Sequence, residues 1–576
     1  MIALLRRFLR PYSRSLVIVV LLLLVQAMAN LFLPTLNADI INKGVVTGDI
    51  GYIWRIGVVM LAVTAALGVT SVAAVYFSAR TAMGFGRDVR AALFAKVQRF
   101  SLYEVNTFGT PSLITRNTND VQQVQMLVLM GLTMMVLAPI TAIGGVIMAL
   151  RLNVQLSAML LVVIPLMAIV IGVLMARAIP LFRSMQIKID AINDVLRETL
   201  TGIRVIRAFV RTRDEEERFA DANADLTDTS LRVARLFAIM LPALMLIMNG
   251  SSVAVIWFGG HLVDSGSMQI GDLTAFLQYL IQILFSVMMA VMLFVMVPRA
   301  AASSERIDEV LATVPAITDP ATPVPERPGR GLVCFEHVTF RYPGAEDAVL
   351  EDVSFTAEPG QTTAIVGGTG SGKTTLVNLI PRLYDVSEGR VSLDGVNVRD
   401  LRQADVWSAM AIVPQKAFLF SGTVASNVRF GRPGASDAQV WQALQTAQAE
   451  EFVRGLPEGL DAPIDQGGAN VSGGQRQRLA IARALVRQAD VLILDDSFSA
   501  LDYATDARLR RALRTAAADT TVIVVAQRVS TIMQADQIIV LDDGRIVGRG
   551  THDELLAECE TYREIVASQL TAEEAA

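Results

Sequence analysis

The chain has 576 residues and a hydrophobic fraction of 53%, with a mean hydropathy of +0.47, which excludes both a single small domain and an ordinary soluble protein. The formal net charge of −5 gives no electrostatic reason to expect a nucleic-acid partner. The two cysteines, Cys334 and Cys559, lie in the stretch assigned below to the cytosol, so we expect neither disulfides nor a cysteine metal cluster.

The N-terminus combines arginines with an apolar run, a pattern shared by secretion signals and first membrane spans. Residues 27–29 fit a cleavage site, but the apolar run continues through 31–33 and five comparable runs follow it. We therefore expect this segment to be retained as a span. Ahead of it, the apolar residues within 2–10 oppose three arginines at helical spacing, which predicts a short helix in the membrane interface.

Six apolar runs are long enough to approach or reach the thickness of a bilayer. They lie at residues 15–36, 53–77, 127–150, 156–176, 236–259 and 273–297. The long segments after the second and fourth runs are rich in arginine and lysine, whereas the opposite loops hold little beyond Lys43 and Arg151. The positive-inside rule therefore places both termini and both long segments in the cytosol.

A proline-rich connection follows the last run and marks a domain boundary. After it, short β-branched runs alternate with helical segments, which predicts an α/β domain with a largely parallel sheet. We therefore divide the chain into a transmembrane domain with an interfacial helix over 1–310, a linker over 311–331 and an α/β domain over 332–570.

A glycine-rich loop between a predicted strand and a predicted helix fits the pattern G-x-x-x-x-G-K-[ST]. Its backbone N–H groups approach phosphates, Lys373 reaches the β- and γ-phosphates, and the Thr374 hydroxyl binds Mg²⁺. Asp495, which follows four apolar residues, is the second magnesium ligand. The candidate nucleotide-binding residues of the loop are Gly367, Gly368, Thr369, Gly370, Ser371, Gly372, Lys373, Thr374 and Thr375. The sequence thus predicts a site for ATP and Mg²⁺.

A second glycine-containing turn, Ser472, Gly473, Gly474 and Gln475, opens another predicted helix. The N-terminus of a helix binds anions, so the chain offers a second phosphate-binding surface. The alternative is a plain helix cap by Ser472, but we expect that a cap alone does not require the glycines and Gln475.

Two residues that follow predicted strands differ from those usual in a site that hydrolyses ATP quickly. In enzymes with such a loop, a glutamate that orients the attacking water usually follows the magnesium-linked aspartate, and here that residue is Asp496. Its carboxylate is one methylene shorter, and a misplacement of ~1 Å can cost roughly a hundredfold in rate. Gln527 stands where a histidine is usual, and it cannot shuttle protons at neutral pH. We expect this site to hold ATP rather than to turn it over quickly.

Together these segments resemble the ATP-binding cassette (ABC) transporters, specifically half-transporters of exporter architecture, over essentially the whole chain. The resemblance implies a membrane α-helical domain of six transmembrane helices, the type I ABC exporter fold, fused to a cytosolic α/β P-loop nucleotide-binding domain in a bacterial-type plasma membrane. It also implies that the phosphate loop of one cassette faces the signature segment of another, Val471 to Gln475 in this chain, with two ATP molecules between them.

The resemblance assigns two further roles. Tyr342 stacks on adenine, and Gln415 binds magnesium together with Thr374 and Asp495 and senses the γ-phosphate. Without the resemblance, Tyr342 would be interpreted as core packing and Gln415 as an exposed side chain.

The departures resemble one subunit of the heterodimeric multidrug exporters. Asp496 replaces the catalytic glutamate of the family and Gln527 replaces its switch histidine, and residues 465–468 differ from its cross-communication loop, whereas the signature segment is intact. This implies a degenerate ATP site here, and a partner half-transporter with glutamate and histidine at the corresponding positions. The alternative is a homodimer in which Asp496 acts as a slow base.

The implied function is ATP-driven export of a hydrophobic or amphipathic small molecule, a drug or a lipid. Met288, Met292 and Met296 share a face of the last span, and flexible thioethers suit such ligands, although helix packing is the alternative. Gln278 and Gln282 are expected to face a cavity.

The cytosolic segments near 109–119 and 190–202 resemble the coupling helices that dock onto cassettes. An importer of a siderophore or lipid built on exporter architecture, and an ATP-gated regulator, remain open alternatives.

Overall fold

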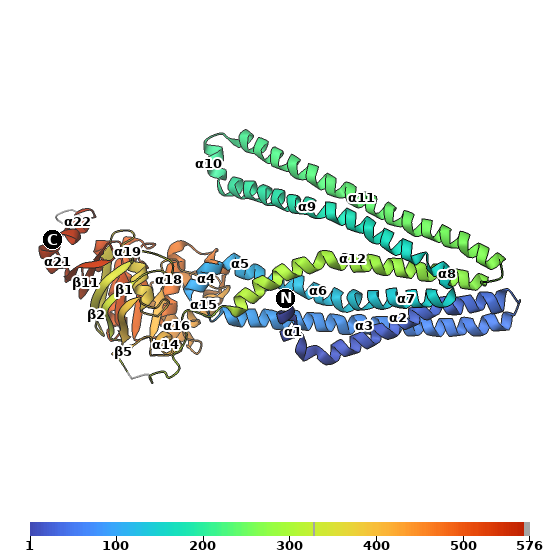
Figure 1. Cartoon of the computed structure of the whole chain (residues 1–576). Coiled ribbons are helices and arrows are strands. Elements are labelled where there is room, and N and C mark those ends of the chain that lie inside the picture. The colour runs from blue at the N-terminus through green and yellow to red at the C-terminus, as the bar shows by residue number, and fades with distance from the viewer. Residues whose placement is uncertain (326–328, 570–576) are drawn as a thin grey trace. The chain divides into compact units, whose positions relative to one another are not determined.

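The computed structural model describes residues 1–325 and 329–569, with 291–295 described by their backbone alone (Figure 1). Three expectations fall outside this description: the side chain of Met292, the part of the linker at 326–328, and residue 570 at the end of the α/β domain.

The chain forms two compact units. A helical unit comprises Met1–Gln98 and Pro111–Thr313. An α/β unit comprises Arg99–Thr110 and the chain from Val314 onward. The short segment Arg99–Thr110 therefore belongs to the same unit as the nucleotide loop, although its neighbours in sequence belong to the helical unit.

Within the described residues, six helical stretches of the helical unit are long and apolar enough to cross a membrane, in agreement with the six predicted spans. The α-helices are α1 (Ile2–Leu9), α2 (Ser13–Asp39), α3 (Ile50–Val97), α5 (Thr110–Thr115), α6 (Val121–Met130), α7 (Val136–Leu152), α8 (Val154–Ser157), α9 (Leu160–Thr201), α10 (Ile203–Ala208), α11 (Thr212–Asp264) and α12 (Ile270–Ala312). The short 3-10 and π segments between them are η1 (Arg10–Tyr12), η2 (Ile40–Val45), η3 (Arg116–Asp120) and η4 (Gly131–Met135).

Polar side chains on α12 bond to neighbouring helices. Tyr279 donates to the carbonyl oxygen of Leu31 at 2.7 Å, and the hydroxyl groups of Ser286 and Thr141 lie 2.7 Å apart. The amide of Gln282 donates to a carbonyl oxygen of α2, and its Oε1 is buried. This contact shows how one end of the amide is stabilised among apolar helices, and the expectation that Gln278 and Gln282 face a cavity stays a prediction.

The short helices near the two predicted coupling segments lie at other residues than the sequence suggested. The short helices lie at α4 (Leu102–Phe108) and α10 (Ile203–Ala208), because residues 110–119 already begin the third long helix and residues 190–201 continue α9. Ser101 and Glu104 form a capping box that starts α4, and Gly109 ends it with φ of 73°. Helices α9 and α11 lie side by side, joined by α10, and the α10 end of this hairpin stands apart from α12 (Figure 1).

The α/β unit contains a six-stranded sheet in the order β12-β11-β3-β10-β9-β6, parallel except for β11–β12, and a four-stranded antiparallel sheet, β2-β1-β4-β5. The strands are β1 (Val333–Phe340), β2 (Leu350–Ala357), β3 (Thr362–Gly367), β4 (Glu388–Leu393), β5 (Val396–Asn397), β6 (Met410–Val413), β7 (Gly422–Thr423), β8 (Pro463–Ile464), β9 (Val491–Asp495), β10 (Thr521–Val525), β11 (Gln537–Asp542) and β12 (Arg545–Gly550). The predicted fold is confirmed.

The six-stranded sheet separates two apolar cores, one on each face. Besides α4, the helices of this unit are α13 (Lys373–Leu379), α14 (Gln403–Ser408), α15 (Val424–Arg429), α16 (Asp437–Thr446), α17 (Glu450–Arg454), α18 (Gly473–Leu485), α19 (Tyr503–Ala516), α20 (Val529–Ile532), α21 (His552–Glu558) and α22 (Glu560–Ala567), with 3-10 turns η5 (Gly459–Asp461) and η6 (Gln466–Gly468). Strands β9 and β10 are buried throughout, as their continuous apolar runs require. Because β3, β9 and β10 are parallel, the residues that follow them meet at one edge of the sheet.

Glu104 links α4 to the segment that follows the helical unit. Its carboxylate is 3% exposed, accepts from the Ser101 N–H and hydroxyl at 2.7 Å, and accepts from the Ala316 N–H at 2.9 Å. We expect Glu104→Ala to destabilise α4 by about 1–3 kcal/mol, because a cap is lost and buried donors are left unpaired. Hydrogen exchange of residues 102–108 measures this. Exchange as slow as in the wild type would contradict it, and Glu560→Ala, in the first turn of α22, is the control.

Candidate nucleotide site

The phosphate loop joins the end of β3 to the start of α13. Gly370 and Gly372 have φ of 87° and 94°, a region that favours glycine. A Cβ on Gly367 would lie 2.0 Å from the carbonyl oxygen of Leu541, so a side chain does not fit there. The space beside Gly368 and Gly370 is open, so a ligand can approach the backbone of the loop closely.

The ammonium group of Lys373 folds back over this loop. Its Nζ donates to the carbonyl oxygen of Gly367 at 2.9 Å, to that of Gly368, and to the Ser371 hydroxyl at 3.3 Å. Burial lowers the pKa of Lys373, while the charges of Asp496 and Asp495 oppose that shift. The lysine is thus placed at the loop with carbonyl and hydroxyl partners that a phosphate can replace.

Asp495 lies at the end of β9 and is only 6% exposed. The Thr374 hydroxyl donates to its Oδ1 at 3.3 Å. Burial raises the pKa of Asp495, and the hydrogen bond from Thr374 partly offsets this. A buried carboxylate beside a hydroxyl forms an oxygen site that fits Mg²⁺.

Within the described residues, no group of three or more histidine, cysteine, aspartate or glutamate side chains is placed to hold a metal by itself. The oxygen site at Thr374 and Asp495 matches the usual magnesium site of nucleotide enzymes, in which one or two protein ligands act together with substrate phosphates. The residues present therefore fit a metal that arrives with a nucleotide.

Asp496 is held by two amides. Its Oδ2 accepts from Gln527 Nε2 at 2.9 Å and from Gln415 Nε2 at 3.3 Å. The residue is 8% exposed, has a left-handed φ of 47°, and donates its N–H to the carbonyl oxygen of Val525 at 3.0 Å. The structure thus brings together the three residues that the sequence predicted separately, and it fixes the carboxylate between two neutral donors.

The backbone after Gln527 is fixed by two groups of contacts. The Gln569 side chain donates to the Gln527 carbonyl oxygen at 2.8 Å and accepts from the Val529 N–H at 2.9 Å. Arginines of α19 reach the following residues: Arg510 donates to the carbonyl oxygen of Ser530 at 2.6 Å, and Arg514 donates to Gln534.

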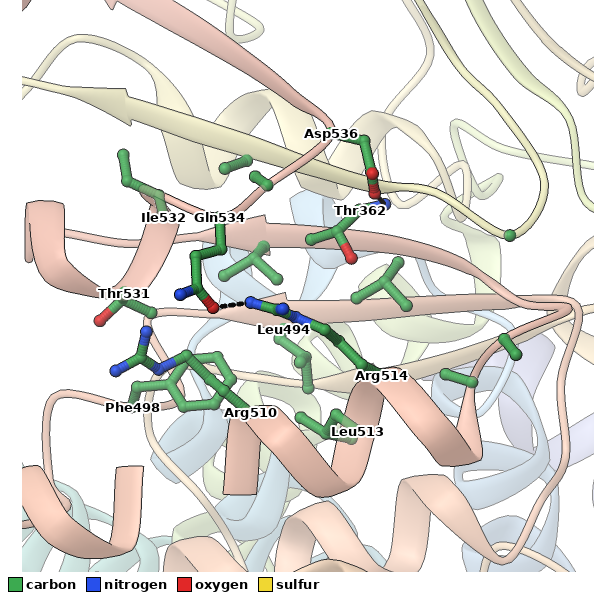
Figure 2. Close-up of a pocket in the computed structure, with 17 residues that line it drawn as sticks. Thr362, Leu494, Phe498, Arg510, Leu513, Arg514, Thr531, Ile532, Gln534 and Asp536 are labelled. Carbon is green, nitrogen blue, oxygen red and sulfur yellow. Dashed lines mark hydrogen bonds between the residues drawn. The ribbon is translucent and has the colours of Figure 1, made fainter. Parts of the chain in front are cut away.

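Figure 2 shows these arginines beside a 330 Å³ cavity that lies between α19, α20 and the sheet. This cavity is separate from the phosphate loop.

Sequence analysis missed Gln569, since nothing around it in sequence indicates a contact with residues forty or more positions away.

Ser472 begins α18 with a complete capping box. Ser472 N–H donates to Gln475 Oε1 at 2.9 Å, and Gln475 N–H donates to the Ser472 hydroxyl at 3.2 Å. The expectation that a cap does not require Gln475 is therefore wrong, because a glutamine three residues after the cap is part of this motif. Gly473 still leaves the helix N-terminus open to a ligand.

This helix N-terminus does not meet the phosphate loop of its own chain. Among the described residues, no hydrogen bond or ion pair joins 471–475 to Gly367–Thr375. Within the described residues, the second predicted phosphate surface is therefore separate from the phosphate loop.

Tyr342 is half-buried at the aromatic cluster behind the loop. Its hydroxyl pairs with that of Thr375 at 2.9 Å, and its ring packs edge-on against Phe340 and Tyr384. The predicted stacking of Tyr342 on adenine involves the exposed part of its ring and stays a prediction. Sequence analysis missed Tyr384, whose hydroxyl accepts from Asn106 of α4 at 3.4 Å and so joins α4 to this cluster.

Asp495→Asn tests the cost of the buried carboxylate. The raised pKa of Asp495 means that folding disfavours its ionised form. Ionised Asp495 therefore lowers the free energy of unfolding at neutral pH, and this destabilisation is absent at pH values below the ordinary pKa of aspartate. We expect the neutral variant to raise the thermal unfolding midpoint of the nucleotide-free protein by a few degrees and to lose the further stabilisation by Mg²⁺ and ATP. The exposed strand-end variant Asp542→Asn should change neither. A lower midpoint for Asp495→Asn would contradict this interpretation.

The comparisons with known proteins place this geometry in a family. Residues 16–287 match the family of the ABC transporter transmembrane region, and residues 350–499 match the ABC transporter family. The chain is 49% identical to an uncharacterized ABC transporter ATP-binding protein of Mycobacterium tuberculosis over 99% of this chain and 98% of that protein. It is 34% identical to the ATP-dependent lipid A-core flippase of Pseudomonas aeruginosa, over 91% of this chain and 86% of that protein.

A solved structure shares the whole architecture. A bacterial Atm1-family ABC exporter with ATP bound superposes with a TM-score of 0.80 at 25% identity, covering 98% of this chain and 99% of the exporter chain. The chain therefore belongs to the ABC transporter family, as a multi-pass membrane half-transporter in which an exporter-type transmembrane region is fused to an ATP-binding domain.

Proposed function

We propose that this chain is one half of a heterodimeric exporter, and that its own phosphate loop holds ATP while hydrolysing it slowly. The supporting observation is the Asp496 carboxylate, which is shortened by one methylene relative to glutamate and bound by the Gln527 and Gln415 amides. The partner is a second half-transporter with glutamate and histidine at the corresponding positions.

The residues of the loop bind the substrate ATP. Lys373 exchanges its carbonyl partners for the β- and γ-phosphates, and the open backbone at Gly368 and Gly370 receives phosphate oxygens. Mg²⁺, when bound, neutralises charge on the phosphates. Thr374, Asp495 and Gln415 are the side chains that would hold it. Tyr342 offers an aromatic surface to the base.

The slow chemistry follows from Asp496 and Gln527. A catalytic base has to lie within hydrogen-bonding reach of the water that it activates. The Asp496 carboxylate is short, and its Oδ2 already accepts two hydrogen bonds from amides. Gln527 is neutral at all physiological pH values and cannot take up or return a proton. ATP bound here therefore stabilises a closed pair of cassettes longer than a rapidly hydrolysed ATP does.

Two features support a second subunit. The signature segment at the N-terminus of α18 makes no hydrogen bond or ion pair with the phosphate loop of this chain, among the described residues. Moreover, the end of α10 presents apolar side chains to solvent, with Phe209 74% and Val210 85% exposed. Exposed apolar residues at the tip of a helical hairpin support a protein contact, and the proposed partner for this contact is a second cassette of the same family.

The direction and cargo complete the proposal. The basic segments support a cytosolic position for the cassette and both termini, and ATP binding and hydrolysis then act from the cytosolic side. The cargo is a hydrophobic or amphipathic small molecule. The relative from Pseudomonas aeruginosa is named as a lipid flippase, and this supports a lipid-like cargo. A homodimer with slow ATPase is the second candidate, favoured by the carboxylate retained at Asp496.

The first test separates the two ATP sites. The chain is co-expressed and purified with a candidate half-transporter that carries the glutamate and the histidine, and ATPase activity is measured in lipid. Asp496→Ala in this chain should lower activity by less than about threefold, whereas replacing the partner's catalytic glutamate should lower it roughly a hundredfold or more. Comparable losses from the two variants would overturn the asymmetric assignment.

The second test restores the missing chemistry. In the self-paired chain, Asp496→Glu combined with Gln527→His should raise the ATPase rate at least about tenfold, because a longer carboxylate and a titratable imidazole return the base and its partner. Asp553→Glu, at an exposed acidic position in the first turn of α21, is the matched control and should leave the rate unchanged. A wild-type self-paired chain that already hydrolyses ATP as fast as the double variant would favour the homodimer.

A further inference from the structure

A pocket of 540 Å³ lies between α9 and α11. Three arginines and a set of apolar residues line it, and we refer to it as the arginine pocket. The lining residues are Ala176, Arg177, Pro180, Leu181, Arg232, Arg235, Leu236 and Ile239. The two helices otherwise pack along their length. Pro180 and the small side chain of Ala176 fall on the pocket wall, where they leave room between the helices.

The arginine pocket lies at the boundary between apolar and charged sequence on both helices. The apolar run at 156–176 ends immediately before Arg177, and the run at 236–259 begins immediately after Arg235. Because α9 and α11 are antiparallel neighbours, these two ends lie at the same level. That level corresponds to the border between hydrocarbon and lipid headgroups on the cytosolic side.

The charges in the arginine pocket are incompletely balanced. Arg232 pairs with Asp228 at 2.6 Å on its own helix. For Arg177 and Arg235, the described residues include no acidic side chain within ion-pairing distance. Arginines elsewhere on the same segment behave differently, since Arg211 and Arg213 pair with Asp214 and Glu217 on α11. Both arginines are exposed and line one pocket, so an anion bound there would be attracted by both guanidinium groups.

The chemistry of the walls defines the ligand. Guanidinium groups bind phosphate oxygens through paired N–H donors. Leu181, Leu236 and Ile239 offer apolar surface next to these groups, which suits the glycerol and acyl portions of a lipid. We propose that the arginine pocket binds an anionic phospholipid of the cytosolic leaflet, with the phosphate held by Arg177 and Arg235. This site is independent of the ATP site and of the proposed division of labour between subunits.

The test measures lipid binding by the full-length protein. Native mass spectrometry in detergent is titrated with phosphatidylglycerol, with phosphatidylcholine as the zwitterionic comparison. Each arginine at an anionic lipid surface contributes about a fivefold gain in affinity, so Arg177→Gln with Arg235→Gln should weaken phosphatidylglycerol binding about thirtyfold. The matched control is Arg211→Gln with Arg213→Gln, which removes the same charge from paired, exposed positions and should change binding by less than about twofold.

Additional variants and competitors distinguish a lipid site from a free-anion site and from a subunit contact. Arg177→Lys with Arg235→Lys keeps the charge but loses the paired donors, and should lose several-fold in affinity even if the glutamine variant folds poorly. Equal losses in the pocket and control variants would overturn the proposal, as would phosphatidylcholine binding as tightly as phosphatidylglycerol. Competition by millimolar inorganic phosphate would overturn it in favour of a free-anion site. Loss of lipid binding when the partner half-transporter is present would overturn it in favour of a subunit contact.

Discussion

Two hydrogen bonds onto Asp496 Oδ2 determine how the nucleotide site is built. They fix a buried carboxylate next to a second one, Asp495, with Lys373 as the nearby positive charge. Two carboxylates and one ammonium leave net negative charge at the sheet edge, so the site favours a divalent cation together with a nucleotide. Asp496 also has a left-handed φ of 47° directly after β9, a conformation that persists only where the surrounding structure fixes it.

The order of the strands produces this arrangement. Strand β9 lies between β10 and β6, so the residue after β9 stands between the residues that follow its neighbours. Gln527 comes two positions after β10 and Gln415 two positions after β6, which gives Asp496 one amide from each side. Beyond the loop, Tyr342 and Tyr384 join the site to Asn106 of α4. Because α4 is continuous in sequence with α3 and α5, movement of the membrane helices has a covalent path to the nucleotide.

Much of this was predictable from sequence, for identifiable reasons. The spans follow from continuous apolar runs, and the phosphate loop follows from glycines between a strand and a helix. The start of α4 was also predictable, since Ser101 and Glu104 have capping-box spacing, as do Ser472 and Gln475. The pairing of Gln415 and Gln527 on one oxygen was not predictable, because it depends on strand order. Gln569 and Tyr384 act through long-range contacts that no local pattern records.

The division of labour that we propose between this chain and a partner can be tested by the chemical state of the nucleotide that each chain holds during turnover. The purified pair is given a photo-crosslinkable ATP labelled on its α-phosphate, irradiated during steady-state hydrolysis and separated into its two subunits. We expect the nucleotide attached to this chain to be still the triphosphate, and the nucleotide attached to the partner to be largely diphosphate. Diphosphate appearing on this chain as fast as on its partner would show that the slow site proposed for Asp496 and Gln527 does not exist.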